Sequence, residues 1–382
     1  MVIVIRDKET FQQLISDIRE FVRDVAIPNE DRVEAEDDIP EDVIDKLKEL
    51  GSFGWSIPEE YGGRGLTSEE LATAFMEFTQ CSVAFRVYGG QNAGIGSECI
   101  IRDGTTAQKE RYLPKLSSGE MIGCLALTET MAGSDATALQ TRAEKVDGGY
   151  RITGDKRYIT LAPIADLYTV FARTDGERGA HGVTAFLIER GTEGMTPGPS
   201  TPKMGQEGAP IGEITFDNAF VPDEAILGGE EGVGFQSVMK ALNKQRINLS
   251  ALSTGPAIRM LDDAVAFAKE RRQFDRAIGE FQLIQAMLAE CKVEIEAARA
   301  LILETARKRD RGEDVTMDVS LCKYYSTEMC GRVADKVVQI FGGQGYVKGT
   351  GIERFYRDVR AFRIYEGTSQ IHLLNIGKRL LR

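Results

Sequence analysis

The spacing of apolar residues changes twice along the chain, and these changes constrain the fold more than any single motif. Up to residue 120, apolar residues recur at helical intervals, as in Leu14, Ile15, Ile18, Phe21, Val22 and Val25. From residue 121 to 230, short β-rich runs such as MIGCLALT and LYTVFAR are separated by turn signals. From residue 231 to 382 the helical interval returns in long stripes, for example Leu321, Tyr325, Met329, Val333 and Val337.

This order predicts an α+β multidomain protein with three parts. We expect an N-terminal helical domain over residues 1–120, a central β-barrel-like domain over 121–230 and a C-terminal four-helix-type bundle over 231–382. Strands and helices do not alternate, which argues against a Rossmann fold. The glycine-rich FGGQGYVKGTG follows a helical stretch and lacks the GxGxxG spacing, so it does not predict a dinucleotide fingerprint.

Local signals predict the bounds of two helices in the first domain. Pro40 is placed to open a short helix that ends at Gly51. Thr67 and Glu70 have the spacing of a capping box ahead of an apolar run that begins at Leu71.

Composition argues against several classes of function. A net charge of −12 disfavours a non-specific nucleic-acid binder, which needs clustered positive charge to neutralise phosphates. The sequence contains no run of eighteen apolar residues, so it predicts no membrane span. The six cysteines form no CxxC pair, and His181 and His372 are too few for a histidine-based metal site. We therefore expect packed, reduced thiols in a cytoplasmic protein without a metal.

Four segments carry most of the chemical information. They are IPEEYGGRG (57–65), CLALTETMAGSD (124–135), KRYIT (156–160) and a C-terminal set of ERRQFDRAIGEFQ, QIFGGQG and IYEGTSQIH. A strand gives way at Thr128 to a glycine-containing loop, whose backbone N–H groups suit the polar edge of an isoalloxazine ring. Tyr158 and Thr160 are expected to share one face of a strand. Together the four segments resemble the acyl-CoA dehydrogenase family over essentially the whole chain.

The resemblance implies FAD as the cofactor and a set of residues that bind it. These are Leu127, Thr128, Ser134, Tyr158, Thr160, Arg271, Phe274, Gln282, Gln339, Gly342, Gly343, Thr368 and Gln370. Arg271, Phe274 and Gln282 are implied to serve the FAD of a neighbouring subunit, which predicts a homotetramer. An electron-transferring flavoprotein is implied as the electron acceptor. Thr130 stands where the family usually has proline, a departure that should alter loop rigidity more than chemistry.

The resemblance also assigns catalysis to Glu366. This carboxylate is implied to abstract the α-proton of an acyl-CoA thioester while the β-hydrogen leaves as hydride, a 2,3-dehydrogenation. Some relatives place the base on the helix that contains LNKQRINLS, but here that position is Gln245, which cannot act as a base. Arg246 matches a family arginine near the CoA moiety. Ser134 and Gly367 complete the implied substrate contacts.

Arg86, in CSVAFRVYGG, bears on the tail of the substrate. Simple fatty-acyl enzymes usually have apolar residues here, whereas the alignment resembles glutaryl-CoA dehydrogenase, whose arginine holds a distal carboxylate. A guanidinium pairs with a carboxylate in bidentate fashion, but a structurally paired arginine fits the sequence equally well. Thr79 and Gly90 replace a glutamate and a serine of glutaryl-CoA dehydrogenases, so decarboxylation after dehydrogenation stays open.

The resulting hypothesis is dehydrogenation of an acyl-CoA with a short-chain or a dicarboxylic, glutaryl-type tail. Two alternatives share the fold. A desulfinase would use Arg86 to bind a sulfinate, but it needs no α-proton abstraction and therefore no Glu366. A flavin-binding protein without dehydrogenase activity is disfavoured by the same glutamate and by the full set of flavin residues.

Overall fold

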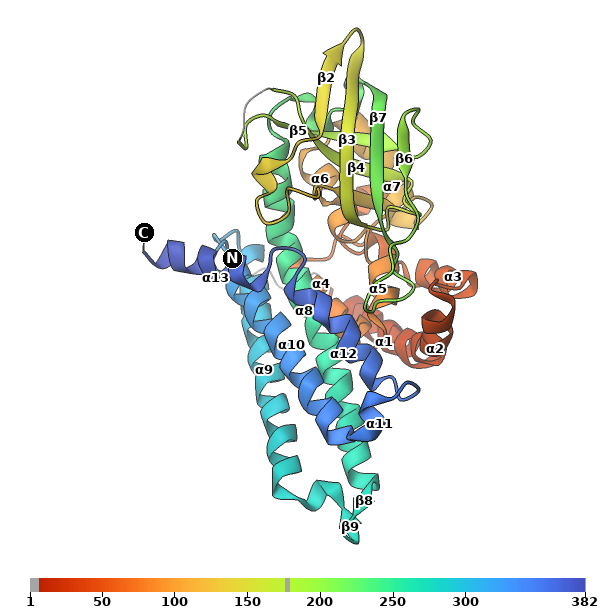
Figure 1. Cartoon of the computed structure of the whole chain (residues 1–382), viewed down its shortest axis with the longest axis vertical. Helices are drawn as coiled ribbons and strands as arrows, with labels where there is room; N and C mark the ends of the chain where they lie inside the picture. The colour runs from red at the N-terminus through yellow and green to blue at the C-terminus, as the bar shows by residue number, and fades with distance from the viewer. Residues whose placement is uncertain (1–6, 176–178, 382) are drawn as a thin grey trace.

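The computed structural model describes residues 7–175 and 179–381. A sheet lies at one end of an elongated molecule, and long helices run from it to the other end (Figure 1). The N-terminal helices lie beside the upper part of these long helices, next to the sheet (Figure 1). Helices from both ends of the sequence share one apolar core, so the two helical regions pack as a unit.

The N-terminal region is helical, as predicted. Its helices are α1 (Lys8–Phe21), α2 (Ile27–Glu36), α3 (Glu41–Leu50), α4 (Ser68–Phe78), α5 (Val83–Gly89), α6 (Ile95–Asp103) and α7 (Thr106–Ser118). Pro40 precedes α3, and Gly51 ends it with φ 71°, which confirms that predicted helix. Both hydrogen bonds of the predicted capping box between Thr67 and Glu70 are present at the start of α4.

The central region forms one seven-stranded sheet. Its strands are β1 (Gly123–Ala126), β2 (Arg142–Val146), β3 (Gly149–Thr160), β4 (Leu167–Arg173), β5 (Val183–Glu189), β6 (Met195–Pro197) and β7 (Ile211–Pro222). Their order is β1-β4-β2-β3-β7-β6, with β5 paired to β4. The sequence did not predict β2 and β6, because β2 is mostly exposed and charged and β6 has only three residues.

The C-terminal region is built on long helices joined to shorter ones. The elements are α8 (Gly234–Glu270), β8 (Arg272–Gln273), β9 (Arg276–Ala277), α9 (Gln282–Asp310), α10 (Asp318–Phe341), α11 (Gly343–Tyr346), α12 (Ile352–Val359) and α13 (Ser369–Leu380). The β8–β9 hairpin joins α8 to α9 at the end of the molecule away from the sheet (Figure 1). α8 packs against α4 as well as α9 and α10, so it connects the two helical regions.

The described residues bear on two expectations from composition. None of the helices within residues 7–175 and 179–381 combines the length and the apolar character that crossing a bilayer requires. All six cysteines are buried, as expected for packed thiols. Burial raises the pKa of the Cys99 and Cys322 thiols to about 12, so both are protonated at neutral pH.

Candidate active site

The predicted base, Glu366, lies in a tight turn between α12 and α13. Its backbone has φ 59°, and that of Gly367 has φ 93°. A left-handed backbone is unfavourable for glutamate by roughly 1–2 kcal/mol, because its Cβ approaches the following carbonyl oxygen. Such a conformation persists only where the surrounding structure holds it.

Three side chains from outside the turn hold its carbonyl groups. Lys323 of α10 donates from Nζ to the Gly367 carbonyl at 2.6 Å. Arg246 of α8 donates from Nε to the Glu366 carbonyl at 3.3 Å. His372 of α13 lies 3.2 Å from the same oxygen through Nε2, which must carry the proton because a carbonyl oxygen only accepts. The turn is thus fixed by three helices.

Glu366 lines a cavity, and its carboxyl group is poorly solvated. Its Oε2 is buried and accepts no hydrogen bond from any described residue. Burial raises the pKa of Glu366 to about 7, against the opposing effect of Arg246, Arg86 and Lys323. A base whose pKa lies near neutral pH is both available and strong, so this carboxylate is suited to proton abstraction.

The cavity beside Glu366 has a volume of about 530 Å³ and is bounded by all three regions of the chain. Its lining includes Arg86, Val87 and Ile95 from N-terminal helices, Tyr158, Thr160 and Ile211 from the sheet, and Gln245, Leu249, Ala361, Ile364, Tyr365 and Glu366 from the C-terminal region. Apolar walls with a few polar groups are typical of small-molecule sites. The structure therefore brings Arg86, Tyr158, Thr160 and Glu366 together.

Arg86 is a buried residue of the cavity wall and is only 5% exposed. Its Nε and Nη2 are buried without a hydrogen bond to the described part of the chain. Its guanidinium carbon lies 4.8 Å from the centroid of the Phe75 ring. Burial lowers the pKa of Arg86 only to about 10, opposed by Tyr365 and Glu366, so the group is charged at neutral pH. Free donors on a buried charge at a cavity wall suit an anionic ligand.

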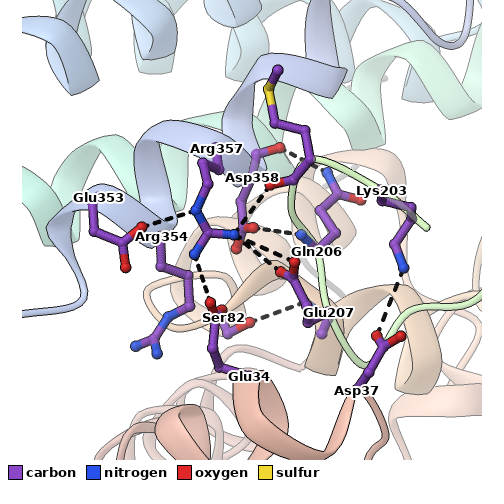
Figure 2. A network of polar contacts seen from close by, with 12 residues as sticks. Glu34, Asp37, Ser82, Lys203, Gln206, Glu207, Glu353, Arg354, Arg357 and Asp358 are labelled. Atoms are coloured by element: carbon purple, nitrogen blue, oxygen red, sulfur yellow. Dashed lines mark hydrogen bonds and ion pairs between the residues drawn. The ribbon is translucent and has the colours of Figure 1, made fainter. Parts of the chain in front are cut away.

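A network of polar contacts fixes one wall of this cavity (Figure 2). The wall includes residues 203–206 and 209 of the segment between β6 and β7. Arg357 of α12 donates to the Met204 carbonyl at 3.1 Å and pairs with Glu207 at 3.3 Å. Another nitrogen of Arg357 lies 2.6 Å from Glu34 of α2. One guanidinium therefore connects parts of all three regions.

Asp358 ties the same segment to α12. Its carboxylate accepts from the Gln206 backbone N–H, and Gln206 Nε2 donates to the Asp358 carbonyl at 2.9 Å (Figure 2). Asp358 is 1% exposed, and its Oδ2 has no hydrogen-bond partner among the described residues. Burial raises the pKa of Asp358 to about 7. Because Gln206 has φ 61°, this wall also adopts a backbone that needs support.

The segment after β1, predicted to contact the flavin, is anchored by a buried ion pair. Lys156 of β3 is fully buried, and its Nζ lies 2.7 Å from Glu129 and 3.3 Å from the Leu127 carbonyl. The Glu129 carboxylate also accepts from the backbone N–H groups of Gln140 and Thr141 at 2.6 and 3.0 Å. Burial lowers the pKa of Lys156 to about 8, opposed by Glu129. These bonds make the start of the predicted flavin loop rigid.

Tyr158 and Thr160 both line the cavity, but not through the regular alternation expected from the sequence. The register between β3 and β7 shifts between Lys156 and Ile159, and Tyr158 has φ 58°. The Tyr158 side chain is 60% exposed at the cavity. The two side chains therefore reach the same cavity through an irregularity in β3, and not through a simple two-residue period.

Six predicted FAD residues lie at the opposite end of the molecule. They are Arg271, Phe274, Gln282, Gln339, Gly342 and Gly343. Arg271 directly follows the last residue of α8, whose 37 residues span about 55 Å, whereas Gly234, the first residue of α8, lies against residues 183–185 of β5. Phe341 at the end of α10 stacks on Phe267 near the end of α8, with ring centroids 4.2 Å apart. Within one described chain, these residues form no single site with Thr128.

The remaining predicted residues occupy varied positions. Thr368 caps α13 and accepts from the Ile371 backbone N–H at 3.3 Å. Ser134 and Gln370 are exposed. Arg246 is 6% exposed and donates from Nη1 to an Asn243 side-chain oxygen at 3.0 Å, beside the Glu366 turn.

Sequence reasoning missed several residues that hold the site, notably Glu129, Lys156, Lys323 and Asp358. For Lys323 a signal was present, because it precedes the buried Ser326 and Cys330 by one and two helical turns, on the buried face of α10. A lysine on such a face is rarely buried without a specific contact. The other three had no comparable signal, since their partners come from distant strands and loops.

Comparisons with known proteins cover all three regions. Models described as the N-terminal, middle and C-terminal domains of acyl-CoA dehydrogenase match residues 8–120, 124–219 and 232–381. A 3-(aryl)acrylate reductase from Clostridium sporogenes is 38% identical over 95% of this chain and 96% of its own length. The caffeyl-CoA reductase-Etf complex subunit CarC from Acetobacterium woodii is 36% identical over 92% of this chain and 93% of its own length.

Solved structures resemble the complete chain. A butyryl-CoA dehydrogenase from Megasphaera elsdenii matches with a TM-score of 0.94 and 35% identity, over 100% of both chains. A glutaryl-coenzyme A dehydrogenase in complex with glutaryl-CoA matches with a TM-score of 0.93 and 35% identity, over 99% of this chain and 97% of that chain. An FAD complex of PigA matches with a TM-score of 0.91 and 27% identity, over 99% of both chains.

Proposed function

This chain belongs to the acyl-CoA dehydrogenase family of FAD-dependent oxidoreductases, and we propose that it oxidises the C2–C3 bond of an acyl-CoA with Glu366 as the base. The observation that carries the proposal is that Glu366 lines the cavity while its Oε2 is buried and accepts no hydrogen bond from the described residues. With a pKa of about 7, it is able to take the C2 proton near neutral pH.

Residues at both ends of the molecule fit FAD, at the cavity and near the β8–β9 hairpin. The ring end of the cofactor suits the cavity, where Tyr158 is exposed and Thr160 lies beside it. At the far end, Gly342 and Gly343 are exposed, and a Cβ on either would meet no described atom within 4 Å, so their backbone is open to close approach. When bound, FAD accepts the hydrogen of C3 as a hydride.

Two further groups act on the thioester in this proposal. As the C2 proton leaves, negative charge develops on the thioester oxygen, and a fixed donor there lowers the barrier. We assign that donor to the Glu366 backbone N–H, whose direction is set by the left-handed turn. Arg246, charged and 6% exposed next to the turn, is assigned to the CoA side.

The tail of the substrate is proposed to carry a carboxylate that Arg86 binds. The support is the buried guanidinium whose Nε and Nη2 have no partner among the described residues, together with the similarity to a structure that contains glutaryl-CoA. Whether decarboxylation follows is a separate question, because Thr79 stands where glutaryl-CoA dehydrogenases tend to have a glutamate. The Thr79 hydroxyl lies 2.7 Å from the Phe75 carbonyl and 3.0 Å from the Leu252 carbonyl, so it serves helix packing. Measuring the release of CO₂ from glutaryl-CoA would answer the question.

The reverse reaction at the same site is a second candidate. It is favoured by two similar proteins that are named as reductases, of 3-(aryl)acrylates and of caffeyl-CoA. In that direction protonated Glu366 returns a proton to C2, and reduced flavin supplies the hydride. The same cavity therefore serves either direction, and the electron partner decides between them.

Assembly and partners are also proposals. Large apolar side chains are exposed on the C-terminal helices and hairpin, among them Phe274, Leu283, Val293, Tyr346 and Leu381. Such surfaces suit a homotetramer in which Arg271, Phe274 and Gln282 reach the cofactor of another copy. The Etf complex named for a similar protein supports an electron-transferring flavoprotein as partner. The cytoplasm stays the proposed location. A flavin-replete monomer in sedimentation would contradict this assembly.

Anaerobic titration of the FAD-loaded protein tests the function. Acyl-CoAs with neutral and carboxylated tails are added in turn, and flavin absorbance is followed. We expect glutaryl-CoA to bleach the flavin at the lowest concentration. Dithionite-reduced protein is then mixed with the matching enoyl-CoAs to measure the reverse reaction. A yellow protein that no thioester reduces, and that no enoyl-CoA reoxidises, would overturn the proposal.

A further inference from the structure

Lys323 is a buried lysine that the proposed chemistry does not use. It is 0% exposed and is not one of the residues that line the acyl cavity in the described structure. From α10 its Nζ donates to the Gly367 carbonyl at 2.6 Å, one residue beyond the proposed base. A buried ammonium is costly unless a charge or a strong acceptor compensates it.

The charges around Lys323 point to Glu366 as its counter-charge. Glu328, the next acidic residue on α10, is already engaged by Arg363 at 3.4 Å and by the Ser369 hydroxyl at 2.5 Å. Burial lowers the pKa of Lys323 to about 8, and among nearby charges Glu366 opposes this most strongly. In return, Lys323 holds down the pKa of Glu366, which burial raises.

The backbone gives a second, independent reason. Glu366 has φ 59° and its carboxylate lies at the cavity only while this turn is kept. Lys323 holds the Gly367 carbonyl of this turn by a hydrogen bond. Arg246 and His372 hold the Glu366 carbonyl in the same way. Loss of the Lys323 contact frees the Gly367 peptide to rotate. A displacement of about 1 Å at a reacting group can cost on the order of 10²-fold in rate.

We propose that Lys323 is a positioning residue for the base: its ammonium fixes the Gly367 carbonyl, so that Glu366 stays in its left-handed turn with the carboxylate ionised and aimed into the acyl cavity. The inference rests on the proposed role of Glu366. Lys323 acts on the base through the Gly367 peptide and through the electrostatic effect of its charge on the Glu366 carboxylate. In this proposal it contacts neither the acyl group nor the flavin.

The other charged and titratable groups around Glu366 are accounted for. They are Arg86 of α5, Arg246 of α8, Glu328 of α10, Asp358 of α12, the adjacent Tyr365 and His372 of α13. Burial lowers the pKa of His372 to about 3, so it is neutral at working pH. Arg86 and Arg246 are retained in every variant below. A change in the titration of the base therefore belongs to Lys323.

The test separates the charge of Lys323 from its hydrogen bond. Lys323→Arg keeps both, Lys323→Gln keeps a donor without the charge, and Lys323→Met keeps neither. Each variant is loaded with FAD, and the rate of flavin reduction is measured from pH 5 to 9 by anaerobic stopped flow. Lys46→Met removes an exposed lysine of α3, paired with Glu49 at 2.6 Å, and serves as the charge-matched control. Glu366→Gln tests the underlying function separately.

Removing the positive charge raises the pKa of the base, so the reaction needs a higher pH. We expect the acidic limb to move up by about one unit in Lys323→Met and Lys323→Gln, and to stay in place in Lys323→Arg and Lys46→Met. The limiting rate should fall by about 10- to 100-fold in Lys323→Met, with KM within about threefold, and be partly restored in Lys323→Gln.

Two outcomes would overturn the inference. The first is an FAD-loaded Lys323→Gln with the wild-type pH profile. The second is an equal loss in Lys323→Arg and Lys323→Met, which indicates packing alone. Should Lys323→Met fail to fold, the pH profile of Lys323→Gln alone decides the first outcome. If Glu366→Gln itself reduces flavin normally, the proposed function fails, and this result is distinct from both.

Discussion

The two ends of the molecule differ in how complete their sites are within one chain. At the cavity, Arg86, Tyr158 and Glu366 come from three different regions and converge on one space. At the hairpin end, Arg271 and Phe274 are exposed, and the described chain supplies no partner surface that completes a site with them. We infer that the acyl chemistry is assembled by packing within the chain, whereas the rest of the cofactor site requires a second copy.

Both ends contain strained backbone, but the cavity end is held by side chains from distant elements, whereas the hairpin turn is held only locally among the described residues, by the β8–β9 pairing and a 2.7 Å hydrogen bond from Arg272 to the Asp275 carbonyl. At the cavity, Lys323 donates a hydrogen bond to the Gly367 carbonyl next to Glu366, and the Asp358 carboxylate accepts one from the Gln206 backbone N–H, so both residues with positive φ are held. At the hairpin, Phe274 and Asp275 have φ 50° and 62° in a two-residue turn that favours asparagine and glycine. A phenylalanine that is 88% exposed in such a turn is poorly explained by the stability of this chain alone.

The largest effect should come from Glu366→Gln. The substitution keeps the shape of the side chain and removes the base, so flavin reduction should slow by about 10²–10⁴-fold while substrate binding is retained. Stopped-flow bleaching measures the first quantity, and the spectral shift of the oxidised flavin on binding measures the second. If the variant keeps more than about a tenth of the wild-type rate, Glu366 is not the base that takes the C2 proton.

Arg86→Ala sharpens the comparison at the cavity end. If Arg86 pairs with a tail carboxylate, wild type should prefer glutaryl-CoA over a neutral acyl-CoA of similar length by roughly 10²-fold in kcat/KM, because an unpaired buried charge is costly. The alanine variant should lose this preference and keep its flavin. Arg86→Lys, which retains the charge without the fork, should fall between the two. A wild type that prefers the neutral thioester would make Arg86 structural.

The smallest effect is expected at the hairpin end. If Arg271 and Phe274 serve another copy, as proposed, Arg271→Ala together with Phe274→Ser should weaken FAD retention by roughly 10-fold and shift the proposed tetramer towards smaller species. Flavin content after gel filtration and sedimentation velocity measure both. Phe220→Ala, at an aromatic of β7 that does not line the acyl cavity, is the control. Unchanged flavin content and assembly in the double variant would place the whole cofactor site within one chain.

The sequence predicted much of this fold because its signals are local. Helical spacing, the capping box at Thr67 and the stop at Gly51 are properties of a few neighbouring residues, and the structure has all of them. The resemblance pointed to Glu366 and Arg86, which lie at one cavity. The supporting contacts could not be predicted, because Glu129–Lys156 and Gln206–Asp358 join segments whose proximity exists only in the folded chain.

The irregular strand at Tyr158 marks the same limit. A two-residue period predicted that Tyr158 and Thr160 share a face, but the register shift before Ile159 depends on pairing with β7. Register is a property of two strands together, so no pattern within KRYIT contains it. Both side chains line one cavity, but a regular two-residue period does not account for it, and their contact with a flavin stays a prediction.

The most direct test of the central claim is exchange of the C2 proton with solvent. An acyl-CoA without hydrogen on C3 is incubated with the FAD-loaded protein in D₂O, and deuterium at C2 is followed by mass spectrometry. Because C3 has no hydride to lose, only the base is tested. Wild type should incorporate deuterium with a rate that rises with pH through about 7, as Glu366 ionises, and Glu366→Gln should not exceed the rate without protein. Exchange by Glu366→Gln at the wild-type rate would contradict the account.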